Sequence, residues 1–149
     1  RLGIEMVKTL KGDATQFLPV LEGMQFDRVL ADVPCSGFGT LRKNPDLKWR
    51  KGEGDIKRLS ELQVAILTHL SGYVKKGGLL VYSTCTVFRE ENEGVVENFL
   101  KEHSEFQPYP MTDALLENCH PFIKDGYLKT FPPKDGMDGF FVARLIKKD

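Results

Sequence analysis

Two of the three cysteines follow apolar runs that end in polar residues. Cys35 comes after Pro34 in the stretch LADVPCSGFGT, and Cys85 comes after Thr84 in LLVYSTCT. A thiolate is a strong nucleophile that can form covalent intermediates with its substrate. A lone cysteine is more often a small buried apolar residue, and this is our interpretation of the isolated Cys119. The position of Cys35 and Cys85, just past two strand-like runs, favours chemistry instead.

Two other kinds of cysteine site are less well supported. A zinc site is disfavoured because the chain has no Cys-x-x-Cys motif and its histidines lie at no ligand spacing. A hydrolase with a Cys/His pair would need a histidine base near Cys35 or Cys85, and no histidine lies in a recognisable motif. The histidines in question are His69, His103 and His120.

Hydrophobic periodicity predicts a helix between two strands that end at these cysteines. Residues 26–33 and 79–85 are apolar runs typical of strands, the second continuous enough for a strand covered on both faces. Residues 55–70 repeat apolar side chains every three or four positions, which is typical of a helix. Parallel strands joined in this way place their carboxyl ends at one edge of the sheet. We therefore expect one crevice to hold Asp32, Cys35, Thr84 and Cys85.

The rest of the chain predicts an α/β fold with an antiparallel end. A short strand is expected at residues 4–10, followed by a turn at Gly12 and Asp13. A second helix is expected at residues 90–103. Strands at residues 126–131 and 139–146, separated by PPKDGMD, are expected to pair antiparallel. We expect a single domain over residues 1–149.

Composition limits the class of protein. At 149 residues and 41% hydrophobic content the chain is sized for one core. Lys plus Arg and Asp plus Glu both number 21, so net charge indicates no polyanionic partner. Three cysteines in such a chain favour a reducing cytoplasm over a disulfide-stapled secreted domain. The sequence has no apolar run of membrane-spanning length and no signal-peptide pattern.

The glycines after Cys35 could suggest a phosphate-binding loop, but the spacing is wrong. The third glycine of a G-x-G-x-x-G motif would fall at Arg42. We expect Gly37 and Gly39 to let the backbone bend closely around a bound base.

A locally basic stretch follows the cysteine loop. Residues 42–58 contain seven Lys or Arg against three Asp or Glu. Such a run is usually a solvated face, but directly after the cysteine loop it could also hold the phosphates of a nucleic acid. Trp49, within the run, could stack on a base or anchor the loop.

Three segments resemble the signature motifs of the Sun (Fmu) family of RNA cytosine-C5 methyltransferases, particularly bacterial members acting on small-subunit ribosomal RNA. They are DVPCSGFGTLRKNPDLKW, YSTCTVFREEN and DGMDGFFVARLIKK. The resemblance spans essentially the whole chain. It implies a Rossmann-like methyltransferase fold, S-adenosylmethionine as methyl donor, a ribosomal RNA substrate, and no DNA or membrane partner.

The resemblance also implies roles for individual residues. Carbon 5 of cytosine is a poor nucleophile, so a thiolate must first add to carbon 6. Cys85 would be that nucleophile, and Cys35 would assist the elimination that releases the product. Asp32 would hold the base at nitrogen 3 and the exocyclic amine, beside the donor. Asp13 would lie near the adenine of the donor, although by itself it is typical of a turn after Gly12.

The environment of Cys85 sets how readily it ionises. An ordinary thiol has a pKa of ~8.5, which a helix N-terminus or a cation would lower. The helix expected at residues 90–103 could act in this way, but its early acidic residues oppose the effect.

Members of this family carry upstream a glycine-rich loop and an acidic residue that hold the donor. Neither occurs here, and the chain begins with Arg1. We therefore expect the C-terminal part of a catalytic domain, with its first two strands and the RNA-binding region absent. Such a fragment is expected to bind the donor weakly or not at all and to be inactive alone. It is also expected either to repair its sheet irregularly or to pair with a second copy through an exposed sheet edge. A non-catalytic RNA-binding module is the alternative.

Overall fold

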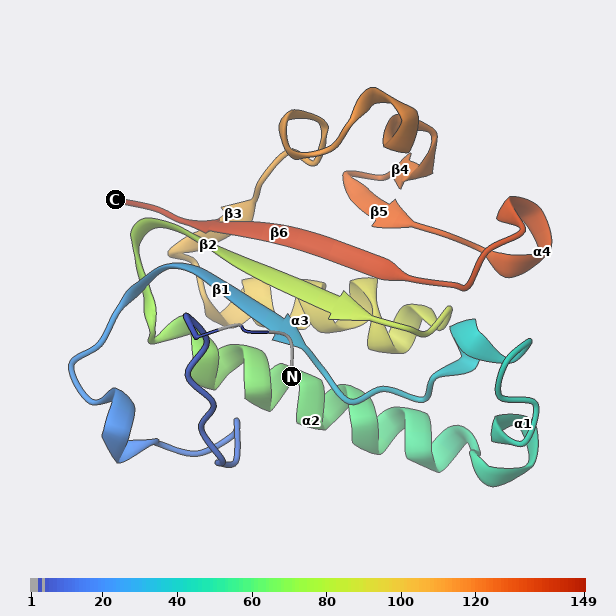
Figure 1. The fold of residues 1–149 in the computed structure, drawn as a ribbon, viewed down its shortest axis with the longest axis horizontal. Coiled ribbons are helices and arrows are strands. Elements are labelled where there is room, and N and C mark those ends of the chain that lie inside the picture. Colours follow the sequence, from blue (N-terminus) through green and yellow to red (C-terminus); the bar gives the residue numbers. More distant parts are fainter. Residues whose placement is uncertain (1–2, 4) are drawn as a thin grey trace.

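The computed structural model describes residue 3 and residues 5–149, and its centre is a mixed six-stranded sheet (Figure 1). The strand order is β1-β2-β6-β5-β4, and β3 pairs with β6 beside this path. The strands are β1 Phe26–Asp32, β2 Val74–Thr84, β3 Phe106–Pro108, β4 Ile123–Lys124, β5 Tyr127–Lys129 and β6 Phe141–Lys147.

Two long helices cover one side of this sheet, as Figure 1 shows. They are α2 Glu53–Ser71 and α3 Glu93–Glu102, and they pack against each other. Shorter helical segments lie in the connections: η1 Pro19–Leu21, η2 Phe38–Thr40, α1 Leu47–Arg50, η3 Arg89–Glu91, η4 Thr112–Ala114, η5 Glu117–Phe122 and α4 Pro132–Asp135.

The strand–helix–strand unit around the cysteines is confirmed. β1 and β2 are parallel neighbours, with Asp32 paired to Ser83, and α2 connects them. The antiparallel pairing of the last two expected strands is also confirmed, since β5 pairs antiparallel with β6. The chain therefore has the predicted α/β fold.

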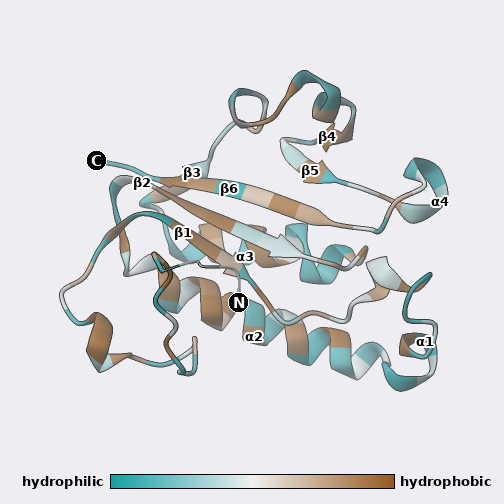
Figure 2. Ribbon diagram, viewed as in Figure 1, coloured by the Kyte–Doolittle hydropathy of each residue, from teal (hydrophilic) through white to brown (hydrophobic). Residues whose placement is uncertain are grey.

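The hydrophobic core lies between the sheet and the two long helices. Figure 2 shows hydrophobic residues concentrated along β1, β2 and β6. Leu80 and Tyr82 of β2 are fully buried, whereas Leu79 and Val81 are partly exposed. The expectation that β2 is covered on both faces is therefore wrong, because the helices cover one face only.

The prediction of a strand at residues 4–10 is also wrong. Residues 5–10 form no strand, and Ile4 lies outside the described residues. Met6, Val7 and Leu10 are largely exposed and have no core to enter. The turn expected after this segment is present, with the Gln16 amide donating to the Asp13 carbonyl oxygen at 3.1 Å.

Candidate functional site

Cys35 and Cys85 meet at the carboxyl edge of the parallel pair. Their Sγ atoms lie 3.3 Å apart, and the backbone amide of Cys85 lies 3.4 Å from the Cys35 sulfur. Each cysteine follows the end of its strand, β1 or β2, so the parallel register brings together two residues fifty positions apart. Both side chains are half-buried, and neither is part of a disulfide.

The two thiols differ in acidity because they share a hydrogen bond. The thiol of Cys35 donates to the sulfur of Cys85 and, against the effect of partial burial, lowers the pKa of Cys85 to about 7. The same hydrogen bond, together with burial, raises the pKa of Cys35 far above its usual value. At neutral pH a substantial fraction of Cys85 is therefore thiolate, whereas Cys35 stays a thiol. The sequence leaves the pKa of Cys85 open between a helix N-terminus or cation and the opposing acids, and in the structure it is Cys35 that lowers this pKa.

Asp32 ends β1 on the same edge and is exposed. Its Oδ1 accepts a hydrogen bond from the Ser83 hydroxyl at 2.7 Å, which fixes the carboxylate at this edge of the sheet. Its Oδ2 accepts no hydrogen bond within the part of the chain that the structure describes, so one oxygen remains available to a ligand. The negative charge of Asp32 is a smaller influence that raises the pKa of Cys85.

The loop after β1 is fastened against the end of β2. Gly37 has a φ of 78°, a left-handed conformation that favours glycine, and its carbonyl oxygen accepts the Thr40 amide at 2.9 Å. The Gly39 amide donates to the carbonyl oxygen of Cys85 at 3.0 Å. The glycines thus bend the loop closely around the second cysteine.

A buried polar cluster underlies this loop and was missed by sequence reasoning. Glu91 is fully buried, and its carboxylate accepts hydrogen bonds from the amide and hydroxyl of Ser36 and from the side chain of Gln63. Ser36 also bonds to the Thr86 hydroxyl at 2.9 Å. Glu91 lies in the run REEN, where nothing in the pattern distinguishes it from the exposed Glu90.

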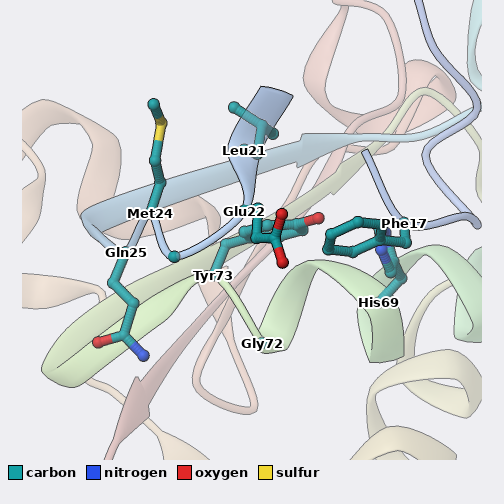
Figure 3. Close-up of a pocket in the computed structure, with 9 residues that line it drawn as sticks. Phe17, Leu21, Glu22, Met24, Gln25, His69, Gly72 and Tyr73 are labelled. Atoms are coloured by element: carbon teal, nitrogen blue, oxygen red, sulfur yellow. The ribbon is translucent and has the colours of Figure 1, made fainter. Parts of the chain in front are cut away.

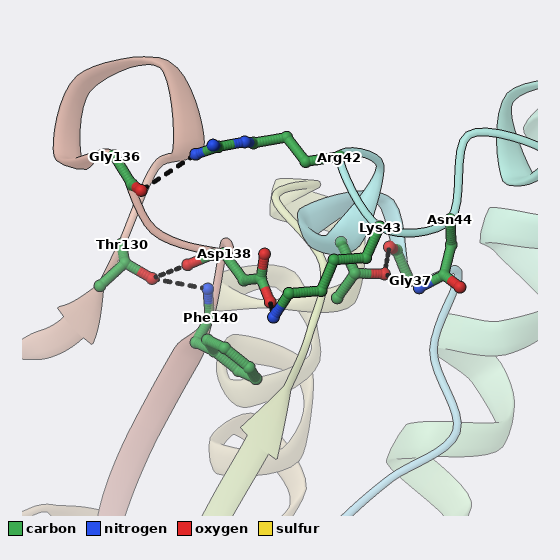
Figure 4. A network of polar contacts seen from close by, with 9 residues as sticks. Gly37, Arg42, Lys43, Asn44, Thr130, Gly136, Asp138 and Phe140 are labelled. Carbon is green, nitrogen blue, oxygen red and sulfur yellow. Dashed lines mark hydrogen bonds and ion pairs between the residues drawn. The ribbon is translucent and has the colours of Figure 1, made fainter.

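The basic stretch follows the cysteine loop and contacts the turn before β6. Figure 4 shows that Arg42 donates to the Gly136 carbonyl oxygen, at 3.0 Å, and that Lys43 pairs with Asp138 at 2.5 Å. Trp49 is 82% exposed, and the ammonium of Lys48 lies 5.1 Å from the centre of its ring. Trp49 therefore does not anchor the loop in the core and offers a free aromatic face.

Asp13 lies in an exposed turn whose own residues occupy it. Its Oδ1 accepts hydrogen bonds from the hydroxyl and the amide of Thr15, at 2.7 and 2.9 Å, and these lower the pKa of Asp13. These contacts match the turn-forming interpretation.

The remaining cysteine and the histidines stand apart from the pair. Cys119 contacts Asn118, its neighbour in sequence, at 3.5 Å. The ring nitrogens of His69 and His120 contact backbone carbonyl oxygens, and those of His103 contact Thr68 and Glu105. Among the described residues, then, no Cys–His pair forms, and no three metal-binding side chains cluster. The hydrolase alternative thus lacks its base.

A separate hollow of about 360 Å³ lies at the opposite end of the parallel strands (Figure 3). It is formed where the segment before β1 meets the end of α2, and Phe17, His69 and Tyr73 line it. The Tyr73 hydroxyl is buried with no hydrogen-bond partner in the described part of the molecule. This hollow is remote from the cysteine edge.

Comparison with known proteins identifies the family of the chain. The model of the family described as 16S rRNA methyltransferase RsmB/F matches residues 1–146. The chain belongs to this family. The predicted Sun/Fmu-type membership is thereby confirmed.

Several curated relatives resemble this RsmB/F family chain over nearly its whole length. A probable ribosomal RNA small subunit methyltransferase B from Bacillus subtilis is 44% identical over 99% of the chain. A protein of the same description from Synechocystis is 42% identical, also over 99%. The match covers 33% of each relative, so the chain spans about a third of the length of the curated relatives it matches.

Solved structures from Pyrococcus horikoshii share the fold of this RsmB/F family chain. NSun6, solved with SFG, superposes with a TM-score of 0.81 at 30% identity and covers 99% of this chain and 36% of its own. A methyltransferase homolog protein gives 0.63 at 29% identity and covers 85% and 40%. The α/β methyltransferase fold is thus established.

None of the helices in the described residues combines the length and apolarity of a membrane span.

Proposed function

We propose that residues 1–149 form part of the catalytic domain of an S-adenosylmethionine-dependent ribosomal RNA (cytosine-5)-methyltransferase. The observation that carries the proposal is the 3.3 Å approach of the Cys35 and Cys85 sulfurs at the edge that also holds Asp32. The pair provides a nucleophile and a second thiol at one position, which is what addition to cytosine followed by elimination requires. Membership of the RsmB/F family supports the ribosomal RNA substrate.

The first step is addition of the Cys85 thiolate to carbon 6 of the target cytosine. With a pKa of about 7, Cys85 is substantially ionised at neutral pH without a separate base. Addition places negative charge on the ring. Asp32 would accept a hydrogen bond from the exocyclic amine and pass a proton from solvent to nitrogen 3, where this charge would otherwise develop; that proton returns to solvent when Cys85 leaves. Its free Oδ2 atom is consistent with this role.

The methyl donor supplies the methyl group that carbon 5 attacks after the addition. Asp32 can face such a donor, since it is exposed at the carboxyl edge where α/β proteins bind ligands. SFG, present in the NSun6 structure, is an analogue of S-adenosylmethionine. The turn that holds Asp13 would contact the adenine if its carboxylate exchanged Thr15 for the ligand. We expect the 149-residue chain alone to bind the donor weakly or not at all. Micromolar binding in calorimetry would contradict this.

Cys35 acts in the last step, when the carbon-5 proton must leave. While Cys85 is a thiolate, its hydrogen bond is the main cause that keeps Cys35 protonated. Once the Cys85 sulfur is bonded to carbon 6, that cause disappears, and Cys35 can release its proton to solvent. The Cys35 thiolate then takes the proton from carbon 5, and the bond between Cys85 and carbon 6 breaks. Thiol and thiolate are restored, with one proton released per methyl group transferred.

RNA would approach across the basic stretch. Trp49 offers an exposed ring on which a nucleobase can stack, and cations around it can neutralise phosphates. Arg42 and Lys43 are held near the cysteine loop by Gly136 and Asp138. If the chain were a non-catalytic RNA-binding module, this surface would bind RNA while the thiols stayed inert. The half-exposed, hydrogen-bonded sulfurs argue against inertness.

The test is a covalent trap. Because the relatives are about three times as long, we would use a chimera in which this chain replaces the matching third of the Bacillus subtilis relative. Cys35→Ala should accumulate a protein–RNA adduct on incubation with small-subunit ribosomal RNA and S-adenosylmethionine, because addition proceeds and elimination fails. A further Cys85→Ala should remove the adduct, and Cys119→Ala should turn over normally. An adduct that survives without Cys85 would refute the assignment.

A further inference from the structure

A carboxylate is buried directly beneath the two cysteine loops. Glu91 is 0% exposed, and its partners are the Ser36 amide at 2.8 Å, the Ser36 hydroxyl at 2.5 Å and the Gln63 side-chain amide at 3.0 Å. All three donors are neutral, and within the described residues no basic side chain pairs with it. Burying a carboxylate is costly unless hydrogen bonds compensate. We therefore expect the buried carboxylate of Glu91 to have a role in holding the loops above it.

The bonds around Glu91 have a defined direction that links the two cysteine loops. The Ser36 hydroxyl donates to Glu91, so in the 2.9 Å contact between Ser36 and Thr86 the Thr86 hydroxyl is the donor. Ser36 follows Cys35 in sequence, and Thr86 follows Cys85. Two hydroxyls in series, ending on a carboxylate, therefore connect the residues next to the two thiols as a hydroxyl relay. Successive hydrogen bonds in such a chain polarise and so strengthen one another.

The same carboxylate fixes the other side of the first loop. Gln63, which α2 presents to the cluster, donates to Glu91 and also to the Pro34 carbonyl oxygen at 2.9 Å. Pro34 precedes Cys35, so the loop is held on both sides of the cysteine. The Tyr82 hydroxyl, from β2, donates to the carbonyl oxygen of Glu91 at 2.5 Å and fixes Glu91 itself.

We propose that Glu91 is the positioning residue of the thiol pair, holding the loop that carries Cys35 against the loop that carries Cys85 through Ser36 and Thr86. Among the described residues Glu91 makes no hydrogen bond to either sulfur, and it acts through the residues beside them. This inference adds a residue to the proposed methyl transfer, and it rests on that proposed function because the thiol pair has a purpose only there. Its test needs neither RNA nor methyl donor, so each idea can fail without the other.

The test compares Glu91→Ala with the isosteric Glu91→Gln in the 149-residue chain. The pH profile of Cys85 alkylation by iodoacetamide, followed by peptide mass spectrometry, reports the hydrogen bond from Cys35. Glu91→Ala should move the midpoint up toward that of an ordinary thiol and slow alkylation at pH 7 by about tenfold. Glu91→Gln can keep the Ser36 amide bond and the hydroxyl relay, so its midpoint should stay close to that of the parent. Glu90→Gln, at an exposed neighbour, is the matched control.

The direction of the shift separates positioning from other roles. The charge of Glu91 by itself raises the pKa of Cys85. If Glu91 acted through charge alone, both variants would therefore lower the midpoint. If it were merely structural, both would lower the free energy of unfolding and leave the midpoint unchanged. Either result would overturn the proposal.

A second pair of variants covers the case in which Glu91→Ala fails to fold. Thr86→Val and Ser36→Ala remove one hydroxyl each from the relay while retaining most of the side-chain volume. Both should raise the alkylation midpoint of Cys85 in folded protein, as judged by circular dichroism. If both leave it at the parent value, the relay does not position the thiols and the proposal is wrong.

Discussion

The amide of Gly139 donates a hydrogen bond to the carbonyl oxygen of Gly39 at 2.8 Å, so the turn before β6 is tied to the loop that carries Cys35. A Cβ atom at Gly39 would overlap the Gly139 carbonyl oxygen and lie 2.7 Å from that of Cys85. Two backbones thus approach Gly39 where no side chain fits.

Gly39→Ala should therefore displace the loop and lower the free energy of unfolding by about 1–3 kcal/mol, as overpacking does. Urea denaturation measures this. Gly54→Ala is the control, since no atom lies within 4 Å of a Cβ there and the residue is in α2, where alanine is favoured. Equal unfolding free energies for Gly39→Ala and the parent would show that the loop moves at no cost.

The acidity of Cys85 should depend on a hydrogen-bond donor at position 35. In the parent, alkylation of Cys85 should rise with pH around a midpoint near 7. Cys35→Ala removes the donor that stabilises the thiolate, so the midpoint should rise and the rate at neutral pH should fall. Cys35→Ser retains a donor and should shift less. A midpoint that is unchanged in Cys35→Ala would mean that another group sets the pKa.

The two thiols should also join on mild oxidation, because 3.3 Å separates their sulfurs. Diamide accepts one hydrogen from each thiol and leaves a disulfide between Cys35 and Cys85. Mass spectrometry of the digested chain should show this cross-link and its reversal by dithiothreitol. Cys119 should remain a free thiol. Preferential pairing of Cys119 with either cysteine would contradict the arrangement of the site.

The sequence predicts the strands and the helix that position the two cysteines, but it does not predict the buried polar cluster around Glu91. Apolar runs ending at Asp32 and Thr84, with a periodic helix between them, are enough to predict a parallel pair and so a shared edge for the two cysteines. Periodicity describes which face of an element is apolar, and it cannot show that one acid of a polar run turns inward. Glu91 is buried because partners from the loop after β1, from β2 and from α2 converge on it, and only the tertiary structure provides them.

In the N-terminal segment the sequence predicts a strand that the structure does not contain. Residues 4–10 have a loosely alternating pattern, but alternation forms a strand only when a neighbouring strand and a core are present. Residues 5–10 have neither among the described elements, and Met6 remains exposed. β1 and β2, in contrast, pair with each other and both pack on α2, so their apolar patterns do lead to strands.

Asp32 should matter to the substrate and not to thiolate formation. Its charge raises the pKa of Cys85, so Asp32→Asn should lower that pKa and leave alkylation at neutral pH undiminished. Methyl transfer by the chimera should nevertheless fall by about 10²–10⁴-fold, the usual contribution of a positioned acid–base group. Asp46→Asn, at an exposed acid beyond the loop, should retain activity. Parallel losses of alkylation and transfer would place Asp32 in thiol activation instead.

β1 has a strand partner on one side only within the described residues, and its outward-facing Leu30 is 66% exposed. An unpaired strand edge beside an apolar side chain favours pairing with a second copy of the chain. Light scattering should therefore give a mass that rises from monomer toward dimer with concentration. Leu30→Lys should reduce this association, because a charge on an edge strand opposes pairing, whereas Val20→Lys, at an exposed apolar residue away from the sheet, should not. A monomer at every concentration would mean that the edge is protected in solution.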